Sequence, residues 1–190
     1  MPRMLVIYGT TEGHTGTIAT TIANTLTARG WDVETVRAGT VDPRPSDYDG
    51  IIVAASVHRG RYQRAVERWV GAHAAELRSK PTAFVSVSLG VLQHDPAVIA
   101  ELDAIVHRFI DPLGWQPTVI KAVAGALLYT KYNVFIRWIM KRIAAKAGGD
   151  TDTSRDYDYT DWNDVRQFAD QFSRRVADAV AVVDPVARRA

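Results

Sequence analysis

The chain alternates short runs of strand length with longer stretches of helical spacing, and no other feature constrains its fold as strongly. Three of the short runs are apolar, as buried parallel strands are, and another alternates polar and apolar residues. The predicted strands are Met4–Gly9, Asp32–Arg37, Gly50–Ala55, Thr82–Ser88 and Val119–Ala124. The predicted helices are His14–Arg29, Arg61–Arg78, Pro96–Ile110, Tyr132–Lys146 and Asp161–Val180, the last capped by Thr160. Such alternation predicts an α/β fold with a parallel sheet and helices on both faces.

Length and composition indicate one ordinary globular domain. The 190 residues fit a single domain, which we place at residues 1–180, with residues 181–190 as a C-terminal tail. Hydrophobic residues make up 47% of the chain, enough to bury a substantial core. The net charge of +2 is too small to indicate a nucleic-acid partner. The absence of cysteine excludes disulfides, thiol nucleophiles and cysteine-ligated metal sites, and it fits a cytoplasmic protein.

Several common kinds of site and segment find no support in the sequence. The N-terminus lacks the anatomy of a signal peptide, and the uncharged stretches are too short to span a bilayer, so no transmembrane helix is predicted. The five histidines show no metal-ligand spacing, so no metal site is predicted. No Gly-x-Ser-x-Gly motif marks a hydrolase, and no catalytic general base can be named.

The stretch YGTTEGHT, at Tyr8–Thr15, lies between the first predicted strand and the first predicted helix. In an open parallel sheet, ligands bind where strands end, and a helix N-terminus favours an anion. The loop contains neither a Gly-Lys-Ser/Thr motif nor GxGxxG, which argues against a P-loop and against a dinucleotide-binding turn. A phosphate monoester such as that of FMN suits it. A helix cap with unrelated threonines is the alternative. The candidate phosphate-binding residues are Thr10, Thr11, Glu12, Gly13, His14 and Thr15.

Two further loops follow predicted strands at the same edge of the sheet. Their backbone amides and apolar or aromatic side chains could flank an isoalloxazine ring, with Tyr62, His58 and Leu89 as its neighbours. Solvated loop residues are the alternative for His58 and Arg59. The candidate residues are Ser56, Val57, His58, Arg59, Gly60 and Tyr62 in the first loop, and Ser86, Val87, Ser88, Leu89 and Gly90 in the second.

The sequence resembles the flavodoxin family, and within it the menaquinone-dependent protoporphyrinogen IX dehydrogenases. The opening loop is similar to the family's phosphate loop. The resemblance to the dehydrogenase branch extends over most of the chain, and its segments are ASVHRGRY, SVSL, AGALLYTKY, IMKRIAAKAGGDTDT and YTDW. It implies a flavodoxin-like five-stranded sheet of order 2-1-3-4-5, with FMN on the three loops. It also implies an oxidoreductase that oxidises protoporphyrinogen IX and passes the electrons to menaquinone in haem biosynthesis.

One segment departs from this family. Family members carry a loop rich in lysine and arginine after SVSL, whereas this chain has the nearly uncharged segment Gly90–Pro96. The electron donor is therefore protoporphyrinogen IX or another small reductant. Three alternatives remain open: a flavodoxin-type electron carrier, an FMN-dependent quinone reductase with another substrate, and a flavin-free phosphate-binding module. Because electron carriers are usually strongly acidic, the charge of +2 speaks against the first.

The segment Lys131–Lys146 combines five basic residues with aromatic and aliphatic side chains and contains no acidic residue. A basic amphipathic helix of this kind can lie on an anionic membrane surface, close to a lipid-soluble quinone. The protein is accordingly expected in the cytoplasm, with peripheral contact to the inner face of the cell membrane. A helix packed on the sheet with a solvated basic side is the alternative.

Overall fold

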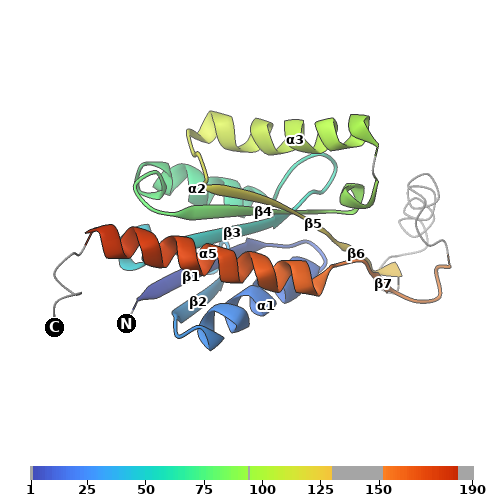
Figure 1. Ribbon diagram of the computed structural model, residues 1–190. Helices are drawn as coiled ribbons and strands as arrows, with labels where there is room; N and C mark the ends of the chain where they lie inside the picture. The colour runs from blue at the N-terminus through green and yellow to red at the C-terminus, as the bar shows by residue number, and fades with distance from the viewer. Residues whose placement is uncertain (1, 94, 130–151, 184–190) are drawn as a thin grey trace.

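A computed structural model describes residues 2–93, 95–129 and 152–183 (Figure 1). Five parallel strands form one sheet in the order β2-β1-β3-β4-β5, as predicted. Consecutive residues of neighbouring strands pair in register, for example Met4 with Gly50 and Ile51 with Thr82. The strands are β1 (Arg3–Gly9), β2 (Asp32–Arg37), β3 (Gly50–Ser56), β4 (Thr82–Ser88) and β5 (Val119–Ala124).

Helices cover both faces of this sheet, which confirms the doubly wound architecture (Figure 1). On one face lie α1 (His14–Ala28) and α5 (Trp162–Val183), and on the other lie α2 (Arg64–Leu77) and α3 (Pro96–Ile110). None of the helices in the described part of the chain combines the length and the apolar character needed to cross a bilayer.

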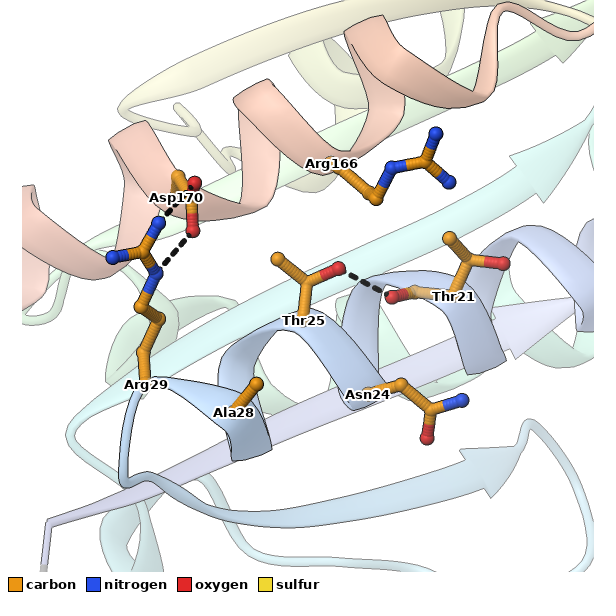
Figure 2. A pocket seen from close by; sticks show the side chains of 7 residues that line it. All are labelled: Thr21, Asn24, Thr25, Ala28, Arg29, Arg166 and Asp170. Atoms are coloured by element: carbon orange, nitrogen blue, oxygen red, sulfur yellow. Dashed lines mark hydrogen bonds and ion pairs between the residues drawn. The ribbon is translucent and has the colours of Figure 1, made fainter.

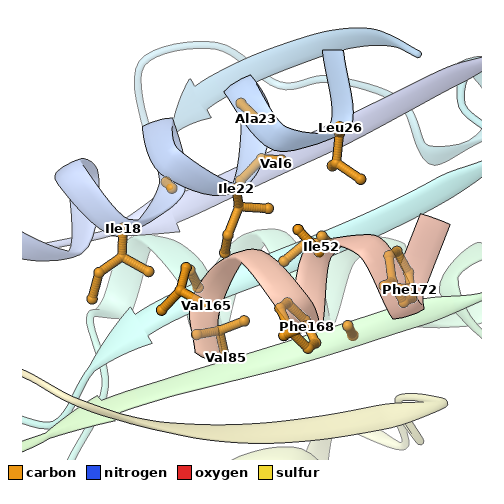
Figure 3. Packing of buried hydrophobic residues seen from close by; sticks show 14 of the residues in the cluster. Val6, Ile18, Ile22, Ala23, Leu26, Ile52, Val85, Val165, Phe168 and Phe172 are labelled. Carbon is orange, nitrogen blue, oxygen red and sulfur yellow. The ribbon is translucent and has the colours of Figure 1, made fainter. Parts of the chain in front are cut away.

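The strand side chains divide between two apolar cores. Successive residues of a strand point to opposite faces, so Met4 and Val6 pack in the core with α1 and α5, whereas Leu5 and Ile7 pack in the core with α2 and α3. Figure 3 shows side chains of α1 and α5 meeting over β1, β3 and β4, including Ile22 and Phe168. Full burial of each such side chain contributes about 1.5–3 kcal/mol, which makes the two layers the main source of stability.

Apart from helix ends that differ by one residue, three predicted details of the helices differ from the structure. Helix α2 begins at Arg64 instead of Arg61, because the chain first makes a tight turn over residues 58–61. Helix α5 continues to Val183, beyond the predicted end at Val180. Thr160 does not cap α5: the Asp161 carboxylate accepts from the first-turn amides, and the Thr160 hydroxyl donates to the Ala124 carbonyl instead.

Several short elements were not predicted, because two to four residues carry no measurable periodicity. They are the 3₁₀ turns η1 (Pro45–Asp47), η2 (Leu89–Leu92) and η3 (Asp111–Leu113), and the antiparallel strands β6 (Ala126–Leu127) and β7 (Tyr157–Asp158). The β6–β7 pair brings the start of α5 back to the end of β5. The predicted helix Tyr132–Lys146 lies outside the described residues.

Candidate functional site

The three predicted loops meet at one edge of the sheet. Because all five strands are parallel, β1, β3 and β4 end side by side there. The amide of Val57, after β3, donates to the carbonyl of Val87, at the end of β4, over 2.8 Å. The amide of Gly125, after β5, donates to the carbonyl of Ser88 over 3.3 Å. The structure thus places the loops where an open α/β sheet binds its ligand.

The loop after β1 presents an uncapped helix N-terminus. Gly13 precedes α1 with φ 101°, a conformation that favours glycine, and no side chain caps the helix there. The Gly13 amide donates to the Thr10 hydroxyl over 2.8 Å, which shapes the loop. The first-turn amides of a helix have no acceptor within the helix, so this end suits an anion.

The six predicted phosphate-loop residues differ in how far they reach the surface. Thr11 and Gly13 are exposed, and Thr10, Glu12 and His14 are half-buried. The side chain of Thr15 is only 1% exposed, so it faces the interior of the protein. The surface hydroxyls available to a phosphate are therefore those of Thr10 and Thr11.

Gln63, which sequence analysis missed, joins the loops that follow β1 and β3. Its Nε2 donates to the Ser56 hydroxyl over 2.9 Å and to the Thr11 hydroxyl over 3.3 Å. Its Oε1 is buried without a hydrogen-bond partner among the described residues and packs against Gly9, where a Cβ atom would lie 2.9 Å from it. Gln63 belongs to no sequence motif, and only the fold brings it to this place.

The loop after β4 contributes one buried, unpartnered hydroxyl. The Oγ of Ser88 has no hydrogen-bond partner among the described residues, although buried hydroxyls are nearly always bonded. Leu89 and Gly90 follow in the turn η2, and both are half-buried. An unpartnered hydroxyl next to a partly exposed apolar wall fits a ligand that combines polar and flat apolar parts.

Tyr62 does not present its ring at the edge of the sheet, contrary to its prediction as a neighbour of the flavin ring. The side chain is 8% exposed and packs against Phe84 and Phe109, with ring centroids 5.0 Å and 4.9 Å away. Its hydroxyl bonds the Ser86 hydroxyl over 2.7 Å in the interior. Tyr62 and Ser86 therefore belong to the core that supports the loops, and they do not line the surface of the site. His58, Arg59 and Gly60 are exposed in the turn that precedes Tyr62.

We expect the free energy of unfolding of a Tyr62→Phe variant to fall less at alkaline pH than that of the wild type. Burial raises the pKa of Tyr62 from 10.0 to about 12, against a smaller lowering by its bond to Ser86. The neutral phenol thus contributes about 2–3 kcal/mol that is complete below pH 10 and is lost as pH rises through about 12. Urea unfolding of both proteins at several pH values would measure the difference. The same dependence of the free energy of unfolding on pH in both proteins would contradict this prediction.

At neutral pH the same substitution leaves the Ser86 hydroxyl without its buried partner and is expected to cost about 1–2 kcal/mol. Tyr48 provides an internal control. Burial and the neighbouring Glu34 carboxylate raise its pKa as well, so part of the alkaline dependence persists in the Tyr62→Phe variant.

His14 links the N-terminus of α1 to the segment before α5. Its Nε2 lies 2.7 Å from the Thr160 Oγ1 and 3.4 Å from an Asp158 carboxylate oxygen. Because the Thr160 hydroxyl proton goes to the Ala124 carbonyl over 2.8 Å, Nε2 must donate to Thr160, and His14 carries its proton there. Trp162 packs edge-on against the imidazole, at 5.8 Å. The YTDW segment signalled a family resemblance but not this contact.

A second concave feature lies away from the strand ends. Figure 2 shows an open groove between α1 and α5, with the Arg29–Asp170 pair at one end and Arg166 across from Thr21. The groove has a volume of ≈ 610 Å³. It follows the C-terminal half of α1, whereas the phosphate loop precedes α1. The groove is therefore separate from the candidate site.

The residues at the strand ends fit FMN. The uncapped α1 N-terminus with two surface threonine hydroxyls suits a phosphate monoester. The unpartnered Ser88 hydroxyl and the half-buried Leu89 suit the polar edge and the apolar face of a flavin.

Comparison with known proteins identifies close relatives. A protoporphyrinogen IX dehydrogenase (quinone) from Leishmania major is 35% identical over 178 residues, covering 90% of this chain and 75% of that protein. A protein of the same name from Escherichia coli K12 is 32% identical over 168 residues, covering 88% of this chain and 92% of that protein.

Solved structures support the fold independently. An archaeal flavodoxin matches with a TM-score of 0.52 at 14% identity, covering 92% of this chain and 99% of that one. A Pseudomonas aeruginosa flavodoxin variant matches with a TM-score of 0.53 at 12% identity, with the same coverage of 92% and 99%. The profile described as Flavodoxin domain matches residues 5–154 and implies FMN as the cofactor, as predicted. The chain therefore belongs to the flavodoxin family, in the group that contains the protoporphyrinogen IX dehydrogenases.

Proposed function

We propose that the protein is an FMN-dependent oxidoreductase that converts protoporphyrinogen IX to protoporphyrin IX, with a quinone as electron acceptor. The observation that carries this proposal is that three loops meet at one edge of the sheet and are hydrogen-bonded to one another. The chain in which they meet is 32–35% identical to protoporphyrinogen IX dehydrogenases. An enzyme of haem biosynthesis is the function that this combination supports best.

In this proposal the loop after β1 holds the FMN phosphate. Thr10 and Thr11 donate their hydroxyls, and backbone amides of the first turn of α1 complete the site, whereas the Gly13 amide holds Thr10 in place. The Thr15 side chain is buried beneath the first turn of the helix. His14 anchors that turn to Thr160, which holds the helix N-terminus in place.

The loops after β3 and β4 hold the flavin ring. Ser56, fixed by Gln63, and Val57 lie on one side of it, and Ser88 and Leu89 lie on the other. When bound, FMN supplies the two-electron redox chemistry. The chain positions the porphyrinogen beside the ring, and each cycle removes two electrons and two protons from it and reduces one quinone to its quinol.

The acceptor is proposed to be menaquinone, reached at the membrane surface from the cytoplasm. The support for this is the basic and aromatic composition of Lys131–Lys146, which suits contact with anionic lipid. That segment lies outside the described residues, so the proposal rests on its sequence. A lipid-soluble acceptor requires the enzyme to approach the surface of the bilayer.

A flavodoxin-type electron carrier is the second candidate, because solved flavodoxins share the fold. Anaerobic mixing of the FMN-loaded protein with protoporphyrinogen IX separates the two functions. Loss of the yellow flavin colour, restored by a menaquinone analogue, supports the enzyme. Flavin that stays oxidised with protoporphyrinogen, but is rapidly reduced by a flavodoxin reductase, supports the carrier.

A further inference from the structure

A tight turn carries exposed basic side chains directly after β3. The His58 amide donates to the Arg61 carbonyl over 2.8 Å, and the Arg61 amide donates back to the His58 carbonyl over 3.2 Å. The two residues between them, Arg59 and Gly60, have φ 52° and 73°. Positive φ at both central residues is the requirement of a type I′ turn.

Arg59 has a backbone conformation in this turn that a residue with a long side chain rarely adopts. It is the one non-glycine residue with positive φ in the described part of the chain. The first central position of such a turn is normally asparagine, aspartate or glycine, and a longer side chain there costs free energy. A long cationic side chain at a strained position beside a site indicates a functional role.

The guanidinium groups here form no ion pair within the described residues. We use the name basic turn for His58, Arg59 and Arg61 together with Arg64, the first residue of α2; all four are exposed. Within the described residues, no carboxylate lies within ion-pairing distance of these arginines.

The opposite side of the site is apolar. The basic turn follows Val57, whose amide is bonded to the end of β4, so the turn lies next to the loop that begins at Leu89. That loop, Leu89–Leu92, has the sequence LGVL, carries no charge and is half-buried. A ligand at this edge therefore meets cations on one side and aliphatic side chains on the other.

We propose that the basic turn binds the carboxylates of the substrate while Val91 and Leu92, which follow the Leu89 assigned to the flavin, receive its apolar macrocycle. This inference rests on the proposed function and assigns the substrate's acidic groups to the loop after β3. Arg61 and Arg64 form ion pairs with the carboxylates, and Arg59 is held outward by the turn to do the same. Arginine suits this role because its planar fork matches a carboxylate.

The test compares a diacid with its diester. The FMN-loaded protein is assayed with protoporphyrinogen IX and with its dimethyl ester, and binding of protoporphyrin IX and its dimethyl ester is followed by porphyrin fluorescence. The test variant is Arg59→Asn/Arg61→Gln. The control variant is Arg108→Gln/Arg175→Gln, which removes the same charge from exposed positions on α3 and α5. Asparagine at residue 59 also suits the turn, so the test variant keeps its fold and its melting temperature.

We expect the test substitutions to weaken binding of the diacid but not of the diester. The test variant raises the KM and the Kd for the diacid at least about fivefold with kcat little changed, and leaves the diester values as in the wild type. The control variant keeps the preference for the diacid. Higher salt weakens binding of the diacid to the wild type more than binding to the test variant, which keeps Arg64.

Three outcomes would overturn the inference. The first is that the wild type binds the diacid and the diester equally well. The second is that the test variant keeps the preference of the wild type for the diacid. The third is that the substitutions reduce only the sedimentation of the protein with phosphatidylserine vesicles and leave porphyrin binding unchanged. The proposed function fails separately. If the holoprotein oxidises no porphyrinogen but binds the diacid through these arginines, the carboxylate site stands and the enzymatic activity does not.

Discussion

Replacement of Thr10 by aspartate is expected to raise the Kd for FMN by about a hundredfold or more. The Thr10 hydroxyl accepts a hydrogen bond from the Gly13 amide over 2.8 Å, and an aspartate carboxylate can accept the same bond. The substitution therefore keeps the shape of the loop but adds a negative charge beside the position proposed for the phosphate. Repulsion at contact distance amounts to about 3 kcal/mol or more at an effective dielectric constant of about 20.

Thr10→Asn is the matched control, because asparagine has the shape of aspartate without its charge. We expect this variant to bind FMN within about tenfold of the wild type. Titration of each apoprotein with FMN, followed by quenching of flavin fluorescence, measures both constants. The apoprotein of the aspartate variant should be as stable as the wild type, since a carboxylate at a helix N-terminus is favourable by about 0.3–1 kcal/mol. Equal FMN affinity of the two variants would place the phosphate elsewhere.

Replacement of Trp115 by alanine is expected to cost about 3–5 kcal/mol of the free energy of unfolding. Trp115 is fully buried in the core with α2 and α3 and packs edge-on against Phe84, at 5.7 Å between ring centroids. Its indole nitrogen donates to the buried Thr82 hydroxyl over 3.2 Å. The variant loses both contacts, a large share of the roughly 5–15 kcal/mol typical of a domain. Its melting temperature should fall by about 10 °C or more.

Trp115→Phe separates packing from hydrogen bonding. Phenylalanine keeps an aromatic ring against Phe84 but leaves the Thr82 hydroxyl without its donor. The expected loss is about 1–2.5 kcal/mol, intermediate between the wild type and the alanine variant. Urea unfolding of the three proteins measures the series. A Trp115→Ala variant within 1 kcal/mol of the wild type would contradict the buried position of the indole.

The sheet could be predicted from the sequence because its strands are buried and its helices are amphipathic. Apolar runs such as GIIVAA leave few choices when both faces of a sheet are covered. The start of α2 could not be placed, because the turn at residues 58–61 depends on a backbone conformation that its arginine does not favour. The β6–β7 pair joins residues about 30 positions apart, and nothing local in either segment marks the pairing.

The meeting of the three loops at one sheet edge was predicted, but the arrangement of their side chains was not. The loops followed from the rule that ligands bind at the carboxyl ends of parallel strands. Tyr62 was placed beside the ring because it follows β3, yet the tight turn returns it to the core against Phe84. Gln63 and Thr160 were missed as site residues, because each acts through a partner far along the chain: Gln63 contacts Thr11, and Thr160 contacts His14.

Porphyrin fluorescence measured without oxygen tests the proposed enzyme most directly. The FMN-loaded protein is mixed with protoporphyrinogen IX, with and without a menaquinone analogue, and the Thr10→Asp variant serves as the cofactor-deficient control. We predict fluorescence that grows over many turnovers with FMN-loaded wild-type protein and quinone together, and little without quinone or with the variant. A yellow, fully loaded wild-type protein that leaves protoporphyrinogen unoxidised in the presence of quinone would contradict the proposed function.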